Sequence, residues 1–332
     1  MKRRDALPAL LAVAATAPDC ALAQPQGAVG RRVLGLLYPN PGSAKATPIG
    51  ARLKELGWDE GENLQIEEAS AEGSNDRLDA LAAGLVRKRV DVIWAAGPEA
   101  ALAAARATRD IPIAFYGVAF PVEQGLVDAL ARPGRNVTGL ASNAGNEGLK
   151  RLEILKEILP AIRRLAIVTT ASAVGTLAGG EYRVPVNLVE SAATVLGFEA
   201  QTFPVSRRED LDAAFAKILE MRAHAVWFDH TALTFRERHR IADFASGARL
   251  PSIGGIKEFV EAGGLLAYGA DRGWMILHSF NHVDKLLRGA RAAELPVELP
   301  SKFELTLNLK TASALGLTIP QTVMLRADRV IE

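Results

Sequence analysis

Residues 91–96, with the sequence Asp-Val-Ile-Trp-Ala-Ala, decide the fold of this 332-residue chain. A short run that is almost entirely apolar is typical of a strand in a parallel sheet that helices cover on both faces. Residues 76–88 before it and 99–108 after it have the length and apolar spacing of amphipathic helices. A strand placed between two such helices predicts βαβ units, and therefore a parallel sheet with helices on both sides.

The same alternation continues in both directions from this strand. Further strands are expected at residues 33–38, 63–68, 111–116, 136–140, 165–170, 199–205, 225–229, 250–253 and 303–309. Further helices are expected at residues 48–56, 147–159, 187–196, 210–221, 235–247 and 274–288. The rhythm makes two units of similar size, which predicts an α/β fold of two doubly wound parallel-sheet lobes.

The two predicted lobes are not separated by a Gly/Ser-rich linker, which indicates that several segments cross between them. Three crossings are expected: near residue 140, at residues 263–271 and at the proline-rich residues 295–300. The first lobe would then comprise residues 31–140 and 266–298, and the second residues 141–265 and 299–332. Three crossing segments would let the lobes rock as a hinge without unfolding.

The first 23 residues have the layout of an export signal peptide. Lys2, Arg3 and Arg4 give a positive start, residues 7–17 form a short apolar run, and residues 21–23 form an Ala-x-Ala cleavage site. Arg3-Arg4 suits a twin-arginine signal but is followed by an atypical Asp-Ala, so the choice between the general and the twin-arginine export path stays open. A periplasmic protein is expected. Pro-Asp before Cys20 disfavours lipid anchoring at that cysteine.

Composition limits the function further. Nearly half of the residues (49%) are apolar and 23% are charged, with a formal net charge of +1, as in ordinary globular proteins. A near-neutral chain without a basic run is a poor partner for nucleic acid. Cys20 is the single cysteine, so the exported chain would have no disulfide and no cysteine nucleophile. We expect a monomer that binds no cofactor.

Ligands of open α/β sheets bind beyond the carboxyl ends of the strands. This rule selects residues 38–43, 97–98, 117–121, 142–143, 169–172 and 229–231, which include Ser43 and His230. Tyr268, in the expected second crossing, is a further candidate. Gly, Pro, Ser and Asn also end strands for purely structural reasons, so each stretch alone has ordinary turn chemistry as an alternative.

Catalytic and metal-binding motifs are absent from the sequence. It contains no phosphate-binding glycine loop, no G-x-S-x-G and no H-E-x-x-H. His278 and His282 are four residues apart but lack a carboxylate at motif spacing, which favours polar helix-face residues over a metal site. His230 after Asp229 could act as a general base, although a hydrogen bond to a ligand or a solvent-exposed turn is favoured. The sequence therefore does not predict an enzyme.

Six stretches resemble one protein family. They are WDEGEN (58–63), DVIWAAGPEAA (91–101), ARPGRNVTGL (131–140), KRLEILKEILP (150–160), EFVEAGGLLAYG (258–269) and the tail LPVELPSKFELTLNLKTASALGLTIP (295–320). Together they resemble the ABC-transporter substrate-binding proteins of the tryptophan-binding type, which have a type I periplasmic binding fold. The resemblance covers nearly all of the chain after the signal peptide.

The resemblance implies a receptor, not an enzyme, that captures a small solute between two lobes and delivers it to a membrane permease. Aromatic amino acids are the best-known ligands of the family. The implied ligand contacts are Pro98, Phe120, Pro121, Ser142, Asn143, Thr170, Ser172, Asp229, Thr231 and Asp271.

One departure from the family concerns the ligand. The family usually has Asp-Pro-Val where this chain has Phe120-Pro121-Val122, so a carboxylate for a ligand ammonium is missing. Asp229 or Asp271 could replace it, or the ligand could lack an amine.

Two rival functions remain. A sensory receptor of the same fold would feed a signalling protein, and a secreted hydrolase would use Asp229 and His230. A DNA-binding regulator of this fold would need a helix-turn-helix before the first strand, where the export signal stands instead.

Overall fold

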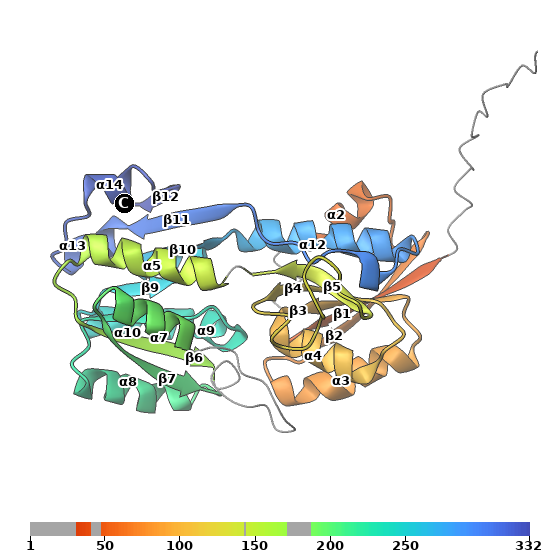
Figure 1. Cartoon of the computed structure of the whole chain (residues 1–332), viewed down its shortest axis with the longest axis horizontal. Coiled ribbons are helices and arrows are strands. Elements are labelled where there is room, and N and C mark those ends of the chain that lie inside the picture. Colours follow the sequence, from red (N-terminus) through yellow and green to blue (C-terminus); the bar gives the residue numbers. More distant parts are fainter. Residues whose placement is uncertain (1–30, 41–47, 143, 171–186) are drawn as a thin grey trace, which may run out of the picture.

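The structure is a computed structural model that describes residues 31–40, 48–142, 144–170 and 187–332. Two α/β lobes lie side by side along the longest axis of the molecule (Figure 1). Ser43, Asn143, Ser172, Cys20 and the expected signal peptide lie outside the described residues.

The first lobe is built on a parallel sheet of five strands. In spatial order these are β2 (Leu64–Ser70), β1 (Arg32–Tyr38), β3 (Val92–Ala96), β4 (Ile113–Val118) and β5 (Val137–Ala141). β3 is the central strand and all five of its residues are buried. The stretch with which the sequence analysis began is therefore the core strand of the first lobe.

Helices cover both faces of this sheet. They are α2 (Ile49–Glu55), α3 (Leu78–Arg87), α4 (Gly97–Ala107) and α12 (Arg272–Leu287), with short 3-10 turns η1 (Asn75–Arg77) and η2 (Ala292–Glu294). α2 and α12 enclose one apolar cluster around Trp94, while α3 and α4 enclose another around Phe115. Trp94 stacks between Tyr116 and Phe280, and its indole N–H donates to Ser279 at 2.9 Å.

The second lobe contains a sheet of seven strands. In spatial order they are β12 (Arg329–Ile331), β11 (Phe303–Asn308), β10 (Leu266–Ala270), β9 (Ser252–Gly254), β8 (Ala225–Phe228), β6 (Arg164–Thr170) and β7 (Glu199–Val205). Its helices are α5 (Ala144–Ile158), α7 (Asn187–Val195), α8 (Asp210–Glu220), α9 (Ala232–Arg236), α10 (Arg238–Gly247), α11 (Lys257–Glu261), α13 (Leu309–Ala314) and α14 (Gln321–Met324).

The structure corrects three details of the sequence prediction. β10 was assigned to the first lobe with residues 266–298, but it pairs with β9 and β11 in the sheet of the second lobe. β10 and β11 are antiparallel, because β11 returns from the other lobe, so the second sheet is mixed. The helix expected at residues 235–247 is two helices, α9 and α10, separated at Glu237, whose backbone leaves the helical conformation.

Three segments connect the lobes, and hydrogen bonds hold them together. They are the residues between β5 and α5, the residues between β10 and α12, and the segment that leads from Glu298 to β11. Ala141 N donates to Glu298 O at 2.8 Å, and Asp271 N donates to Lys302 O at 3.2 Å. The third segment therefore lies between the other two, as expected of a narrow multi-stranded hinge.

Candidate functional site

The carboxyl ends of the parallel strands in both lobes point toward the boundary between the lobes. Pro98 lies in the first turn of α4, directly after β3, and is half-buried. Phe120 and Pro121 follow β4, and Ser142 follows β5 at the first crossing. The structure thus places Pro98, Phe120 and Pro121 of the first lobe at the carboxyl ends of its strands, together with Ser142, which was predicted as part of the second lobe.

Phe120 has an unusual backbone conformation at this edge. Its φ is +53°, in the left-handed region that non-glycine residues seldom adopt. Its side chain is half-buried, whereas Pro121 after it is fully buried. Such strain persists only where surrounding structure enforces it, and it is often found at functional sites.

In the second lobe, Asp229, His230 and Thr231 follow β8. The indole N–H of Trp227 donates to Asp229 Oδ1 at 2.7 Å, so one carboxylate oxygen already has a partner inside the lobe. The Thr231 hydroxyl accepts from Thr234 N at 3.2 Å and caps α9. Two of the three predicted residues therefore also have structural roles.

Three other predicted residues have different surroundings. Thr170 ends β6, where its backbone pairs with Val205. Tyr268 lies within β10 and stacks on Phe303, with ring centroids 6.0 Å apart, and it packs against the core of the second lobe. Asp271 caps α12, since its Oδ1 accepts from Trp274 N at 2.9 Å.

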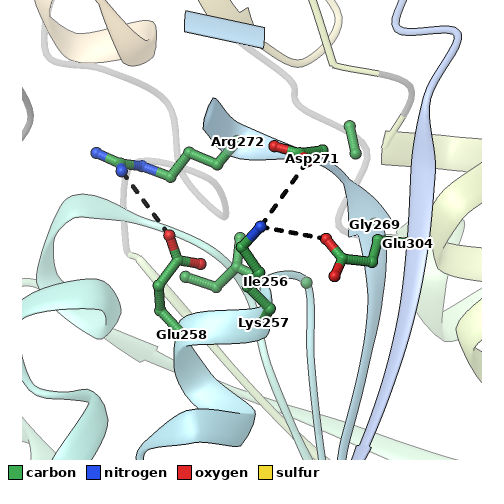
Figure 2. Close-up of a pocket in the computed structure, with 9 residues that line it drawn as sticks. Ile256, Lys257, Glu258, Gly269, Asp271, Arg272 and Glu304 are labelled. Atoms are coloured by element: carbon green, nitrogen blue, oxygen red, sulfur yellow. Dashed lines mark hydrogen bonds and ion pairs between the residues drawn. The ribbon is translucent and has the colours of Figure 1, made fainter. Parts of the chain in front are cut away.

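A small pocket lies at the hinge end of the boundary, where Lys257 and its acidic partners line one side (Figure 2). Its volume is about 210 Å³, including the solvent at its mouth. Lys257 Nζ lies 3.8 Å from Asp271 Oδ2 and 3.4 Å from Glu304 Oε2. The positive charges of Lys257 and Lys302 and the bond from Trp274 N lower the pKa of Asp271, although burial opposes the shift. Asp271 is therefore ionised at neutral pH and already neutralised by lysines.

Arg272 also lines this pocket, and the sequence analysis did not select it. It is the first residue of α12 and only 9% exposed. Its guanidinium lies over the ring of Phe235 from α9, 4.8 Å from the centroid, and 3.9 Å from Glu258 of α11. Arg272 thus contacts two helices of the second lobe from a helix that packs on the first. The sequence feature that could have identified Arg272 is its charge at a position just after the end of a strand.

Arg151 is a second buried arginine that the sequence analysis passed over. Its Nε donates to Tyr268 O at 2.5 Å and its Nη2 to Glu147 at 2.8 Å, and its guanidinium lies over the Trp227 ring. These contacts join α5 to β10 and β8. Arg151 therefore stabilises the second lobe behind the edge that carries Asp229.

His230 lies between these positive groups. The crowding of protein atoms around its ring, and then the charges of Arg272 and Arg151, lower its pKa. More than a third of the residue is still accessible to water. The imidazole is neutral at pH 7 and can donate or accept a hydrogen bond.

Within the described ranges no group of three or more His, Cys, Asp or Glu side chains is arranged to hold a metal ion. In the same part of the chain no helix is both long enough and apolar enough to cross a membrane.

Comparison with known sequences identifies the family. The sequence pattern of the ABC transporter substrate binding proteins matches residues 43–331. The chain belongs to this family. The predicted family is confirmed, and with it the predicted type I periplasmic binding fold.

Three relatives of this substrate-binding protein span most of its length. It is 24% identical over 280 residues to the tyrosine-binding protein of Clostridioides difficile (strain R20291), covering 84% of this chain and 78% of the relative. A domain of Streptococcus pneumoniae solved in complex with L-Trp is 23% identical and covers 91% of this chain and 100% of its own, with a TM-score of 0.82. A conserved domain protein of Vibrio cholerae is 25% identical and covers 91% of this chain and 99% of its own, with a TM-score of 0.81.

Proposed function

We propose that this chain is the extracytoplasmic receptor of an ABC importer. It captures a small, aromatic or carboxylate-bearing, amino-acid-like solute between its two lobes and passes it to a membrane permease. Family membership supports transport, and the tyrosine-binding relative supports an amino-acid-like solute.

The observation that carries the capture mechanism is a direct contact between the facing edges. Arg236 Nη1 of α9 donates to Gly73 O, in the loop after β2 of the other lobe, at 3.2 Å. The Arg272–Phe235 contact is a second link between elements of the two lobes. Contacts of this kind form when the lobes approach and are lost when they rock apart, while the hydrogen-bonded crossings remain intact.

Solute binding would shift the population toward the closed form, because only that form contacts the solute from both sides. The residues proposed to make these contacts are Ser43, Pro98, Phe120, Pro121, Ser142, Asn143, Thr170, Ser172, Asp229, His230, Thr231, Tyr268 and Asp271. Asp271 and Tyr268 have strong partners inside the protein, so they contribute to the frame around the solute more than to its direct recognition.

A thermal-shift screen tests this function. A solute present at one hundred times its dissociation constant should stabilise the protein by about 2.7 kcal/mol and raise Tm by about 4 °C. The screen should contain the twenty L-amino acids, aromatic carboxylic acids and sugars. No shift with any amino acid or aromatic acid would contradict the proposed solute class, and chemical conversion of a solute would contradict a receptor.

Export has its own test. The proposed signal peptide, residues 1–23, would be removed and the mature protein would be a periplasmic monomer that starts at Gln24. Intact mass measured on protein from a periplasmic fraction should equal that of residues 24–332. A lipid-modified Cys20 at the mature N-terminus would contradict this proposal.

A further inference from the structure

Arg272 is a buried cation with unused hydrogen-bonding capacity. A guanidinium carries five N–H donors. Among the described residues, the contacts of this guanidinium are the Phe235 ring, Glu258 at 3.9 Å and the Tyr116 hydroxyl, which leaves most of its N–H donors available. Burial raises the pKa of the Tyr116 hydroxyl, and the charge of Arg272 and its interaction with this hydroxyl oppose the rise.

Glu258 has unused capacity on the opposite side of the pair. The 3.9 Å between Glu258 Oε1 and Arg272 Nη1 is an ion pair but is too long for a hydrogen bond. Its other oxygen, Oε2, is buried and has no hydrogen-bond partner. Arg272 is buried and Glu258 is partly buried, and charged groups removed from water without hydrogen-bond partners are costly for folding, so the pair needs a further explanation.

The neighbouring charged groups do not show this deficit. Lys257 interacts with Asp271 and Glu304, and Arg151 donates to Glu147 and to a backbone carbonyl. Asp229 accepts from Trp227. Among the described residues that line the pocket, Arg272 and Glu258 face each other and together offer both a donor and an acceptor to a bound molecule.

The two residues also belong to elements that move relative to each other in a hinged protein. Arg272 begins α12, which packs on the sheet of the first lobe, and Glu258 lies in α11 of the second lobe. Figure 2 shows both side chains on the wall of the hinge pocket, directed toward each other. A molecule held by both residues would favour one relative position of the lobes.

We propose that Arg272 and Glu258 together bind the head group of an α-amino acid. Arg272 donates to the carboxylate of the solute, and Glu258 accepts from its ammonium group. A guanidinium is suited to planar recognition of a carboxylate. Glu258 supplies the carboxylate that is missing at Phe120. The inference rests on the proposed receptor function and narrows its solute class to zwitterionic amino acids.

The test uses L-tyrosine and two analogues, measured by isothermal titration calorimetry on the mature protein. 3-(4-Hydroxyphenyl)propionate lacks the ammonium group and tyramine lacks the carboxylate. If another amino acid from the twenty gives the largest thermal shift, its desamino acid and its amine replace these probes. Wild-type protein should bind the amino acid at least 10-fold more tightly than either analogue.

Each variant should lose affinity for a different pair of probes. R272Q should lower the affinity for the amino acid and for the desamino acid by about 10- to 100-fold. Its affinity for the amine should be unchanged or higher. E258Q should lower the affinity for the amino acid and for the amine by a similar factor, and its affinity for the desamino acid should not change. R291Q and E261Q, which change surface ion pairs with Glu294 and Arg329, are matched controls and should bind as wild type.

The outcomes separate this inference from the receptor function. If wild-type protein binds a solute that lacks a carboxylate or an ammonium group at least as tightly as it binds the amino acid, the head-group assignment is wrong while the receptor function stands. If R272Q loses the same factor of affinity for all three probes, Arg272 only stabilises the closed form, and this result also overturns the assignment. If no amino acid binds, both proposals fail. If R272Q does not fold, R272K replaces it as the test variant. R272K keeps the positive charge, and its affinity for the amino acid should still be at least 10-fold lower than that of wild type.

Discussion

Arg236 Nη1 in α9 and Gly73 O in the loop after β2 are 3.2 Å apart, although they belong to different lobes. The lobes are therefore linked by a hydrogen bond at a point remote from the three crossing segments. Gly73 has φ +84°, and a side chain at this position would overlap Arg236. The Arg236 guanidinium would have to shift to accept a larger residue at position 73.

The first prediction concerns this link. Arg236→Ala should lower solute affinity by about 2- to 10-fold, because a hydrogen bond specific to the closed form contributes roughly 0.5–1.5 kcal/mol. The Tm of the solute-free protein should change little, since Arg236 is exposed. Calorimetry and thermal unfolding check the two parts. Unchanged affinity would show that the link is irrelevant to closure.

The second prediction concerns Asp229. Asp229→Ala should destabilise the protein by about 1–3 kcal/mol, because the indole N–H of buried Trp227 would lose its acceptor. Asp229→Asn keeps a side-chain oxygen for Trp227 and should unfold close to the wild-type denaturant midpoint. Equal destabilisation by both variants would indicate that the charge, and not the hydrogen bond, matters.

The third prediction concerns the strained residue at the boundary. Phe120→Asn keeps a residue type that tolerates φ of +53° and removes the aromatic ring. Aromatic solutes should bind at least about 3-fold more weakly, while Tm should stay within a few degrees of wild type. The comparison uses one aromatic and one aliphatic amino acid in calorimetry. An equal effect on both solutes would argue against ring stacking.

The fourth prediction concerns pH. Burial lowers the pKa of His282, whose Nε2 lies 3.1 Å from Pro296 O. At a pH below 6.5, the ordinary pKa of histidine, His282 is therefore protonated in the unfolded chain more readily than in the folded protein. Unfolding free energy should fall as pH decreases below about 6.5. His282→Gln should flatten the fall between pH 6.5 and 5 in urea titrations. Identical slopes would exclude His282 as its source.

Glu298 should add a second loss of stability at lower pH. Its Oε2 lies 2.8 Å from His278 Nε2, and this bond, with the charges of the nearby histidines and Lys285, lowers its pKa although burial opposes the shift. A carboxylate with a depressed pKa stabilises the protein above its ordinary value of 4.5 and loses this contribution as pH falls further. Glu298→Gln should remove this second step in the same titrations.

Most strands of both sheets could be predicted because their apolar pattern is local, whereas β10 and β12 were not expected as strands. β3 and β6 lie close to where the sequence placed them. Residues 266–270, which form β10, were expected in a crossing segment and were assigned to the wrong lobe, because their local sequence does not show which sheet they join. That depends on pairing with β11, almost forty residues later in the chain. The break between α9 and α10 at Glu237 was also missed, since that sequence is compatible with a continuous helix.

The site was only partly predictable for a related reason. Strand ends located Pro98, Phe120 and Asp229 at the boundary, because in parallel sheets strand direction fixes position. Arg272 and Glu258 have the appearance of ordinary helix-start charges in the sequence. The contacts of Arg272 come from Phe235 and Tyr116, which lie in other parts of the chain. His282 was expected on a polar helix face but is 1% exposed, because the proline-rich segment with Pro296 covers it.

The central claim, that two hinged lobes close on a solute, is tested most directly by a distance measured between the lobes. In a chain whose single cysteine, Cys20, is replaced by serine, Arg87→Cys and Leu219→Cys place one exposed label on each lobe. Double electron–electron resonance should show a broad distance distribution without solute. With the amino acid identified by calorimetry it should narrow to a single population that represents the closed form. An unchanged distribution at saturating solute would contradict the account.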